Sequence, residues 1–215
     1  MKLKNKSIFL SAIFGGFWAV QSVAADTTDL FHLQQRWAEV NYQMEGKAQL
    51  TAFAQLVEES EALSAKEPSS AEIWIWKGII KSTYAGAKGG LGALALAKEA
   101  KVDLETSVDL DPNALGGSAY TTLGTLYHSV PGWPLGFGDD DTAEELLIKA
   151  VNLNPEGIDT NYFYGTYLLD EERYAEAGKI LLQAQNAPAR PDRPVADSGR
   201  QREISEALEL LNKKR

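Results

Sequence analysis

The chain has 215 residues, of which 21 are Lys or Arg, 30 are Asp or Glu and none is Cys, so its formal net charge is −9 at pH 7. An acidic balance argues against a nucleic-acid-binding protein, because such proteins need a basic face to neutralise phosphates. The lack of Cys excludes disulfides, thiolate metal ligands, a cysteine nucleophile and lipid attachment through cysteine. The length predicts one domain or one short repeat array.

The first 25 residues have the layout of an export signal. Three lysines precede an almost uncharged apolar run from Ile8 to Val20, and residues 22–25 suit signal peptidase. A transmembrane anchor is the alternative, but this run is shorter than the roughly 20 apolar residues that a span needs. We expect cleavage after Ala25, which leaves 18 basic and 30 acidic residues and a charge of −12. The mature protein should be periplasmic, without stable membrane insertion.

From Leu30 onward the pattern is that of one helix after another. Apolar residues recur at spacings of three and four, first at Leu30, Leu33, Trp37, Val40 and Met44. No segment alternates with period two for long enough to predict a strand. Pro68, Pro112 and Pro155 each end a helical pattern, and they lie 44 and 43 residues apart. This regular interval predicts a repeat architecture.

Three units share a pattern when they are aligned on these prolines. The first helix of each unit carries a glycine flanked by large residues, at Gly78, Gly124 and Gly165. The second helix carries small residues and a leucine on one face: Ala100, Leu104 and Ser107; Ala143, Leu147 and Ala150; Ala177, Leu181 and Ala184. This pattern resembles the tetratricopeptide repeat (TPR), in which two antiparallel helices pack closely. The resemblance implies an all-α fold, an α-solenoid of TPR-type helical hairpins. An unrelated helical bundle is the alternative.

The repeat register predicts the domain organisation. After a signal peptide at 1–25, residues 26–215 should form a single TPR-like helical domain. It would contain a degenerate pair at 29–68, repeats at about 71–112, 117–155 and 158–189, and a capping helix at 198–214. The capping helix has Ile204, Leu208 and Leu211 on one side, and it should cover the apolar face of the last unit.

Two insertions lengthen the turns inside the first and second units. In the first, residues 84–94, we expect a glycine-rich loop folded tightly over a helix end. It lacks the Gly-Lys-Ser/Thr ending and the preceding strand of a phosphate loop. The second, residues 130–138, contains Trp133 and Phe137, which either plug a gap between repeats or form a lid or ligand-stacking surface. The carboxylates at 139–141 should cap a helix rather than bind calcium.

A proline-rich crossing at 187–202 joins the last repeat to the capping helix. It carries four arginines: Arg190, Arg193, Arg200 and Arg202. Contact with an anion or a carboxylate is one interpretation. Local ion pairs with Asp192 and Asp197, which would pin the crossing, are the interpretation that we favour.

The C-terminal half also resembles exported TPR proteins that are grouped with the T component of TRAP transporters. The residues that carry this resemblance are the loop at 131–139, the helix at 158–165 and the Arg-Pro-rich ending. It implies a helical periplasmic oligomer that partners the substrate-binding subunit of a solute transporter. The better-known members are lipid-anchored, whereas this chain has no cysteine after its signal.

The register also predicts a binding surface. In TPR superhelices the first helix of each unit lines the concave groove, so residues three before and one after each glycine should point inward. With their neighbours, they give nine candidate partner-binding residues: Glu72, Ile75, Ile79, Thr121, Thr125, His128, Asp159, Tyr162 and Thr166. The Lys and Asn of the carboxylate-clamp type are missing at the six register positions. We therefore expect a neutral groove that suits a peptide or a neutral ligand.

Catalysis is not expected from the sequence. The two imidazoles, His32 and His128, lie in no local motif with an acid and a nucleophile, and no metal-binding spacing occurs. We predict no cofactor and no metal. The leading hypothesis is a non-enzymatic periplasmic scaffold or adaptor that binds an envelope protein or peptide. The alternative is a T-component-like partner of a periplasmic solute-binding subunit, or a small-ligand-binding protein that uses Trp133, Phe137, Arg190 and Arg193.

Overall fold

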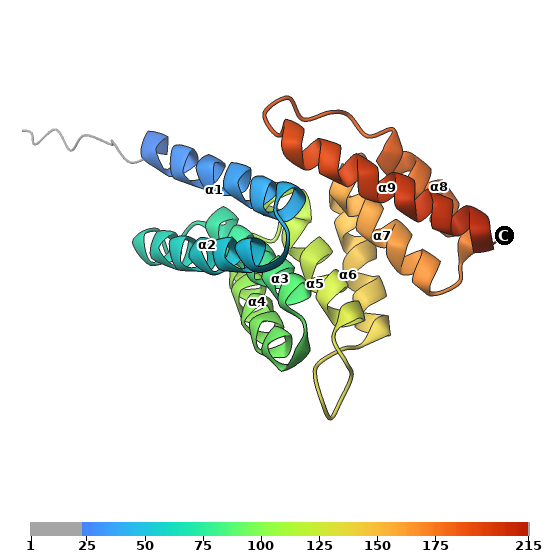
Figure 1. Cartoon of the computed structure of the whole chain (residues 1–215), viewed down its shortest axis with the longest axis horizontal. Coiled ribbons are helices and arrows are strands. Elements are labelled where there is room, and N and C mark those ends of the chain that lie inside the picture. The colour runs from blue at the N-terminus through green and yellow to red at the C-terminus, as the bar shows by residue number, and fades with distance from the viewer. Residues whose placement is uncertain (1–22, 215) are drawn as a thin grey trace, which may run out of the picture.

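The computed structural model describes residues 23–214, and within them the side chains of all but residues 23–27 and Leu91. The elements of this part of the chain are all helices, joined by turns and loops, which confirms the predicted all-α class (Figure 1). The helices are α1 (Val23–Gln43), α2 (Gly46–Lys66), α3 (Ala71–Lys88), α4 (Gly90–Leu110), the short 3-10 helix η1 (Ala114–Gly117), α5 (Ser118–Ser129), α6 (Asp140–Leu153), α7 (Ile158–Asp170), α8 (Tyr174–Gln185) and α9 (Pro194–Lys214).

The predicted export signal at residues 1–25 lies outside the described residues except for its last three, so it stays a prediction. Among the helices from Val23 onward, none is both long and apolar enough to cross a membrane.

Successive helices pair as α1/α2, α3/α4, α5/α6 and α7/α8, and the pairs stack side by side. In the last three pairs a glycine in the first helix allows the close approach. A Cβ added at Gly78 would lie 2.5 Å from Leu104 Cγ, and one at Gly165 would lie 2.8 Å from Leu181 Cγ. The small residues and leucines predicted to face the first helices are all buried. The α3/α4, α5/α6 and α7/α8 hairpins therefore each pack a glycine on the first helix against a leucine on the second.

A charged cluster is buried where α3 meets α4. The Asp103 carboxylate lies 3.0 Å from the Nζ of Lys77 and 3.0 Å from the Nζ of Lys81, and all three side chains are almost fully buried. Glu61 and Glu99 add two further carboxylates around Lys81 from the protein surface. Because a buried charge without a partner is costly, Asp103 is needed to keep both lysines in place.

The first insertion is helical, so the predicted loop at 84–94 is wrong. α3 continues to Lys88 and α4 begins at Gly90, with only Gly89 between them. The alanines of this segment favour helix. The reversal needs the left-handed backbone region only at Gly89 and Gly90, with φ of +62° and +64°.

The second insertion is a loop that projects away from the helices between α5 and α6 (Figure 1). At its end the Asp139 carboxylate accepts a hydrogen bond from the backbone N–H of Thr142 at 2.7 Å, and α6 starts at Asp140. This contact confirms the predicted helix cap.

The last helix has a second role besides covering α7 and α8. Ile204 and Leu211 are buried against the last hairpin, as predicted for a cap. The start of α9 also contacts α1, where the Tyr42 hydroxyl donates to Glu203 at 3.2 Å and Gly199 lies against the Tyr42 ring. The C-terminal helix thus closes the array back onto its first hairpin.

Candidate functional site

A cavity of about 920 Å³ lies between the first helices of the four hairpins. Its walls come from α1, α3, α5 and α7, with η1 and the turn before α7. No residue of α2, α4, α6 or α8 lines it in the described part of the chain. The crossing at 188–193 and the first turns of α9 close one side.

Asp159, at the start of α7, is the anchor for the crossing. Its carboxylate accepts hydrogen bonds from Arg190 Nη1 at 2.7 Å and from Arg200 Nε at 2.8 Å. Arg190 also pairs with Asp197 at 2.6 Å, and Arg200 with Glu203 at 2.6 Å. Burial alone would raise the pKa of Asp159, but the guanidinium groups of Arg200 and Arg190 hold that pKa well below its usual range.

Arg193 has a different environment. Its guanidinium carbon lies 4.9 Å from the centre of the Trp76 ring, which is within the range of a cation–π contact. Among the described residues, no carboxylate lies within ion-pair distance of it. Burial and the nearby charge of Arg190 lower the pKa of Arg193 from its usual value, and they outweigh the attraction of Asp159, Asp197 and Asp192. This cation is thus partly desolvated, with carboxylates nearby but none of the described chain in a direct ion pair with it.

Two buried polar atoms on the cavity wall also lack a partner within the described chain. They are the indole Nε1 of Trp76 and the hydroxyl of Thr121, on residues that are 3% and 4% exposed. Trp37, by contrast, donates its indole N–H to Thr83 at 3.1 Å. Buried polar groups in proteins are nearly always hydrogen-bonded, so these two atoms are exceptions within the described chain, although neither atom is itself exposed to the cavity.

Comparison with known proteins supports the fold. No family model matches the sequence, and no curated protein matches it. The structure is similar to the crystal structure of TTC0263, a thermophilic TPR protein in Thermus thermophilus, with a TM-score of 0.56. The match covers 86% of this chain and 99% of that chain at 16% sequence identity. The fold is that of a TPR-like helical protein. The predicted fold class is confirmed, whereas export and the similarity to the T component stay predictions.

The TPR-like register places five of the nine predicted groove residues on the cavity. Ile79, Thr121, Thr125, Asp159 and Tyr162 all line it. Arg190 and Arg193 of the crossing line it as well. That these residues bind a partner remains a prediction.

The other four predicted groove residues lie elsewhere. Ile75 is fully buried in the core, because α3 packs at this turn against α4 and α5. Glu72 accepts a hydrogen bond from Ser70 at 3.0 Å near the start of α3. The Thr166 hydroxyl donates to the Phe163 carbonyl at 3.0 Å. On α3 the cavity is therefore lined from Trp76 onward, the residue after the predicted Ile75.

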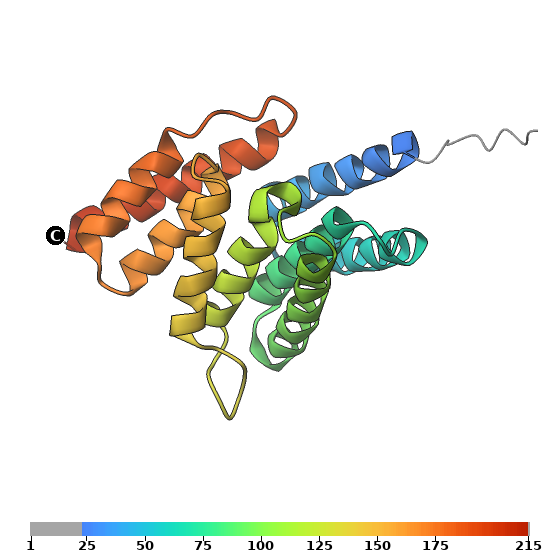
Figure 2. The ribbon, with the colours of Figure 1, turned by 180° about the vertical axis from the view of Figure 1, so that it is seen from behind.

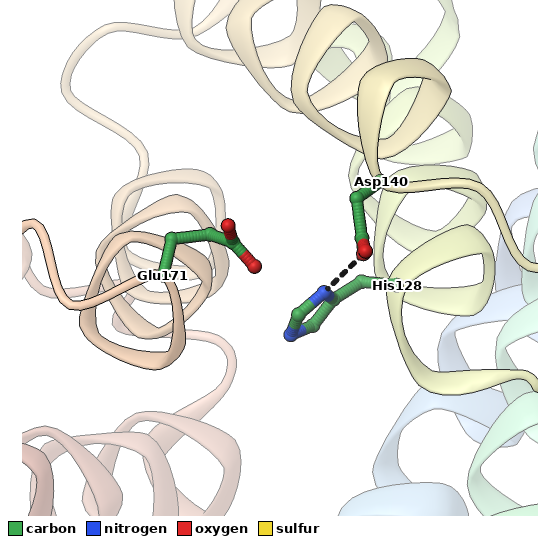
Figure 3. Close-up of side chains that lie close together, drawn as sticks. All are labelled: His128, Asp140 and Glu171. Atoms are coloured by element: carbon green, nitrogen blue, oxygen red, sulfur yellow. Dashed lines mark hydrogen bonds and ion pairs between the residues drawn. The ribbon is translucent and has the colours of Figure 1, made fainter.

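His128 is the fourth, and it joins the ends of three helices outside the cavity. Its Nδ1 lies 3.0 Å from Asp140 and its Nε2 lies 3.2 Å from Asp170. Figure 3 shows Glu171 reaching toward the same ring from the end of α7, and the ligand-type atoms of His128, Asp140 and Glu171 lie within 4.8 Å of one another. Burial lowers the pKa of His128, but hydrogen bonds to Asp140 and Asp170 outweigh this and raise it overall.

The two aromatic residues of the second insertion differ in exposure, and neither of them lines the cavity. Phe137 packs edge-on against Tyr127, with ring centres 5.3 Å apart, which agrees with a plug between elements. Trp133 is 89% exposed, so it plugs no gap. Figure 2 shows its loop projecting on the side opposite the crossing between α8 and α9. A surface role for Trp133 is the part of the prediction that remains.

The crossing contradicts the expectation of a neutral groove. It folds over the concave face, so charged residues of both signs line the cavity: Arg190, Arg193 and Arg200, with Glu156, Asp159, Asp192 and Glu203. The prediction of ion pairs is confirmed for Asp197, but Asp159 is the main partner, and Asp192 is exposed. Sequence reasoning missed Asp159 as a partner because it lies 31 residues before Arg190. It also missed Trp76, for which the only signal was its place on a first helix.

Proposed function

We propose that this protein is a non-enzymatic binding scaffold of the cell envelope that holds a segment of another protein in its concave cavity. The observation that carries the proposal is the composition of the cavity wall, to which the first helix of every hairpin contributes. A continuous surface of this kind is how repeat arrays bind extended partners. The envelope location rests on the predicted export signal.

The chemistry of the wall suits a chain segment. The helices α1, α3 and α7 contribute aromatic side chains to the wall, and α5 contributes Thr121, Thr122 and Thr125. Ligand pockets are mostly apolar with a few polar groups that set orientation, and they range over roughly 300–1,000 Å³. A volume of about 920 Å³ is at the large end of this range, which favours several residues of a peptide over one small molecule.

The polar residues of the cavity support binding over catalysis. Asp159, Arg190 and Arg200 neutralise one another, and Glu203 is held by Arg200. Neither imidazole of the chain lines the cavity. A hydroxyl nucleophile there would therefore lack a histidine base, which hydroxyl nucleophiles commonly use.

A second candidate function is a small-ligand-binding or transporter-associated protein. The observation that favours it is the contact between α9 and α1, which makes the cavity more enclosed than an open groove. Genes for TRAP membrane and binding subunits next to this one would favour that alternative.

The scaffold proposal can be tested by affinity capture from periplasmic extract of the native host. Thr125→Arg should abolish capture of the specific partner, because it places a long cation inside the cavity. Leu182→Arg, at an exposed position on α8 outside the cavity, is the matched control and should capture normally. Equal capture by both variants, or loss of capture with both, would refute a role for the cavity.

A further inference from the structure

Two of the three arginines on the cavity wall are already neutralised. Asp159, Asp197 and Glu203 surround Arg190 and Arg200. Arg193 lines the same wall without a direct ion pair in the described chain, although Asp159, Asp192 and Asp197 lie near enough to attract it. Arg193 is therefore the arginine of the cavity whose guanidinium has no carboxylate of the described residues bonded to it.

The Arg193 guanidinium lies in a cation–π contact with Trp76 and makes no hydrogen bond or ion pair within the described chain. Its five N–H donors therefore remain available to a ligand. A planar oxyanion fits the edge of a guanidinium through two parallel hydrogen bonds. The ring of Trp76 thus supports the guanidinium through a cation–π contact, without accepting a hydrogen bond from it.

The unpartnered atoms of Trp76 and Thr121 differ from Arg193 in their access to the cavity. An indole N–H can only donate, and a hydroxyl can donate as well as accept. Arg193 is the donor on the cavity wall, and the unpartnered atoms of Trp76 and Thr121 are buried in residues beside it. A carboxylate accepts through two oxygens and carries the compensating charge.

The acids of the cavity do not favour a cationic ligand instead. Asp159 and Glu203 are both paired with buried arginine, so a ligand ammonium would have to displace a guanidinium. The remaining acids, Glu156 and Asp192, are exposed at the rim. They are well solvated, so they attract a cation only weakly.

We infer that the cavity binds a carboxylate, with Arg193 as its anchor and Trp76 as the support of that anchor. The inference rests on the proposed function, since it names the group of the bound segment that the cavity recognises. The carboxylate is the C-terminus of a partner peptide or belongs to a free organic acid. The carboxylate is bound by a residue of the crossing, whereas the carboxylate-clamp type binds it through Lys and Asn on the first helices.

The test is an NMR titration of the whole protein with acetate, the minimal carboxylate, followed through the Arg193 Nε–H and the Trp76 indole N–H signals. Acetate should shift both signals saturably, and acetamide, which has the same shape without the charge, should not. Arg193→Gln should weaken acetate binding about tenfold or more, as expected for loss of a bidentate charge-assisted contact. Arg202→Gln, at an exposed arginine outside the cavity, is the matched control.

Two further ligands identify the source of the carboxylate. A library of N-acetylated pentapeptides with free C-termini should bind more tightly than the same library amidated if the C-terminus of a partner is recognised. Benzoate should bind more tightly than either library if a small organic acid is recognised. Equal responses to acetate and acetamide in the wild-type protein would overturn the inference without any variant. If acetate fails while Thr125→Arg still blocks partner capture, the proposed function stands and the carboxylate site does not.

Discussion

Replacement of Asp159 by asparagine tests how the cavity is closed. Asn has nearly the same shape but no charge, so Arg190 and Arg200 lose the carboxylate that they share. Arg190 keeps Asp197 and Arg200 keeps Glu203. The Arg200 side chain is only 7% exposed, so its charge has little access to water. We therefore expect Asp159→Asn to destabilise the folded protein.

The size of the effect follows from burial. Removing one partner of a fully buried ion pair costs about 3–5 kcal/mol. The Asp159 side chain is 36% exposed and two acids remain, so solvent screening lowers the expected loss to about 2–3 kcal/mol. At about 2–4 °C per kcal/mol for a domain of this size, Tm should fall by roughly 4–12 °C.

Urea unfolding followed by far-UV circular dichroism measures this loss. Asp192→Asn, which removes an exposed acid from the same crossing, is the control and should change the free energy of unfolding by no more than about 0.5 kcal/mol. The pKa of Asp159 is lowered on folding, so its contribution is present above the unfolded value and is lost as pH falls below about 4. A loss for Asp159→Asn no larger than that of the control would refute the anchoring role of this carboxylate.

Three other substitutions test the fold. Gly165→Ala should cost about 1–3 kcal/mol in thermal melts, because the added Cβ would overlap the Leu181 side chain. Gly86→Ala has open space around it and should leave stability unchanged or raise it slightly, so equal effects would contradict the glycine–leucine packing. Asp103→Asn should cost about 3–5 kcal/mol in urea unfolding, because it leaves buried Lys77 without a carboxylate and Lys81 with only Glu61 and Glu99 at the surface. Glu99→Gln at the exposed edge should cost under about 1 kcal/mol, and similar losses for the two variants would show that the cluster is not buried as a unit. His128→Asn should flatten the pH dependence of stability, because the pKa of His128 is raised on folding. The stabilisation by His128 is full below pH about 6.5, the pKa of an unfolded histidine, and disappears as pH rises through the folded pKa. An unchanged pH profile would exclude this contribution.

The repeat could be predicted because each unit encodes its own packing. Gly165 and Leu181 lie 16 residues apart and meet within one hairpin, so the spacing alone carries the contact. The extended helices of the 84–94 segment could not be predicted in the same way. There the presence of glycines suggested a loop, but only Gly89 and Gly90 adopt a conformation that requires them.

The cavity could be predicted only in part. The register placed Thr121 and Thr125 on its wall, because residues four apart share one face of a helix. It gave no information on the path of the crossing, which decides that Arg193 lies over Trp76. Nor did it predict the contact between Tyr42 and Glu203, which are 161 residues apart. Closure of the array depends on such long-range pairs, and no local spacing in the sequence encodes them.

Site-specific photocrosslinking tests most directly whether the concave cavity is the binding surface. A photoreactive amino acid at Thr125, inside the cavity, is compared in living cells with the same group at Leu182, which is 49% exposed and lies outside it. We predict a discrete crosslinked partner from position 125 and none from position 182. No adduct at position 125, or the same adduct from both positions, would contradict the account.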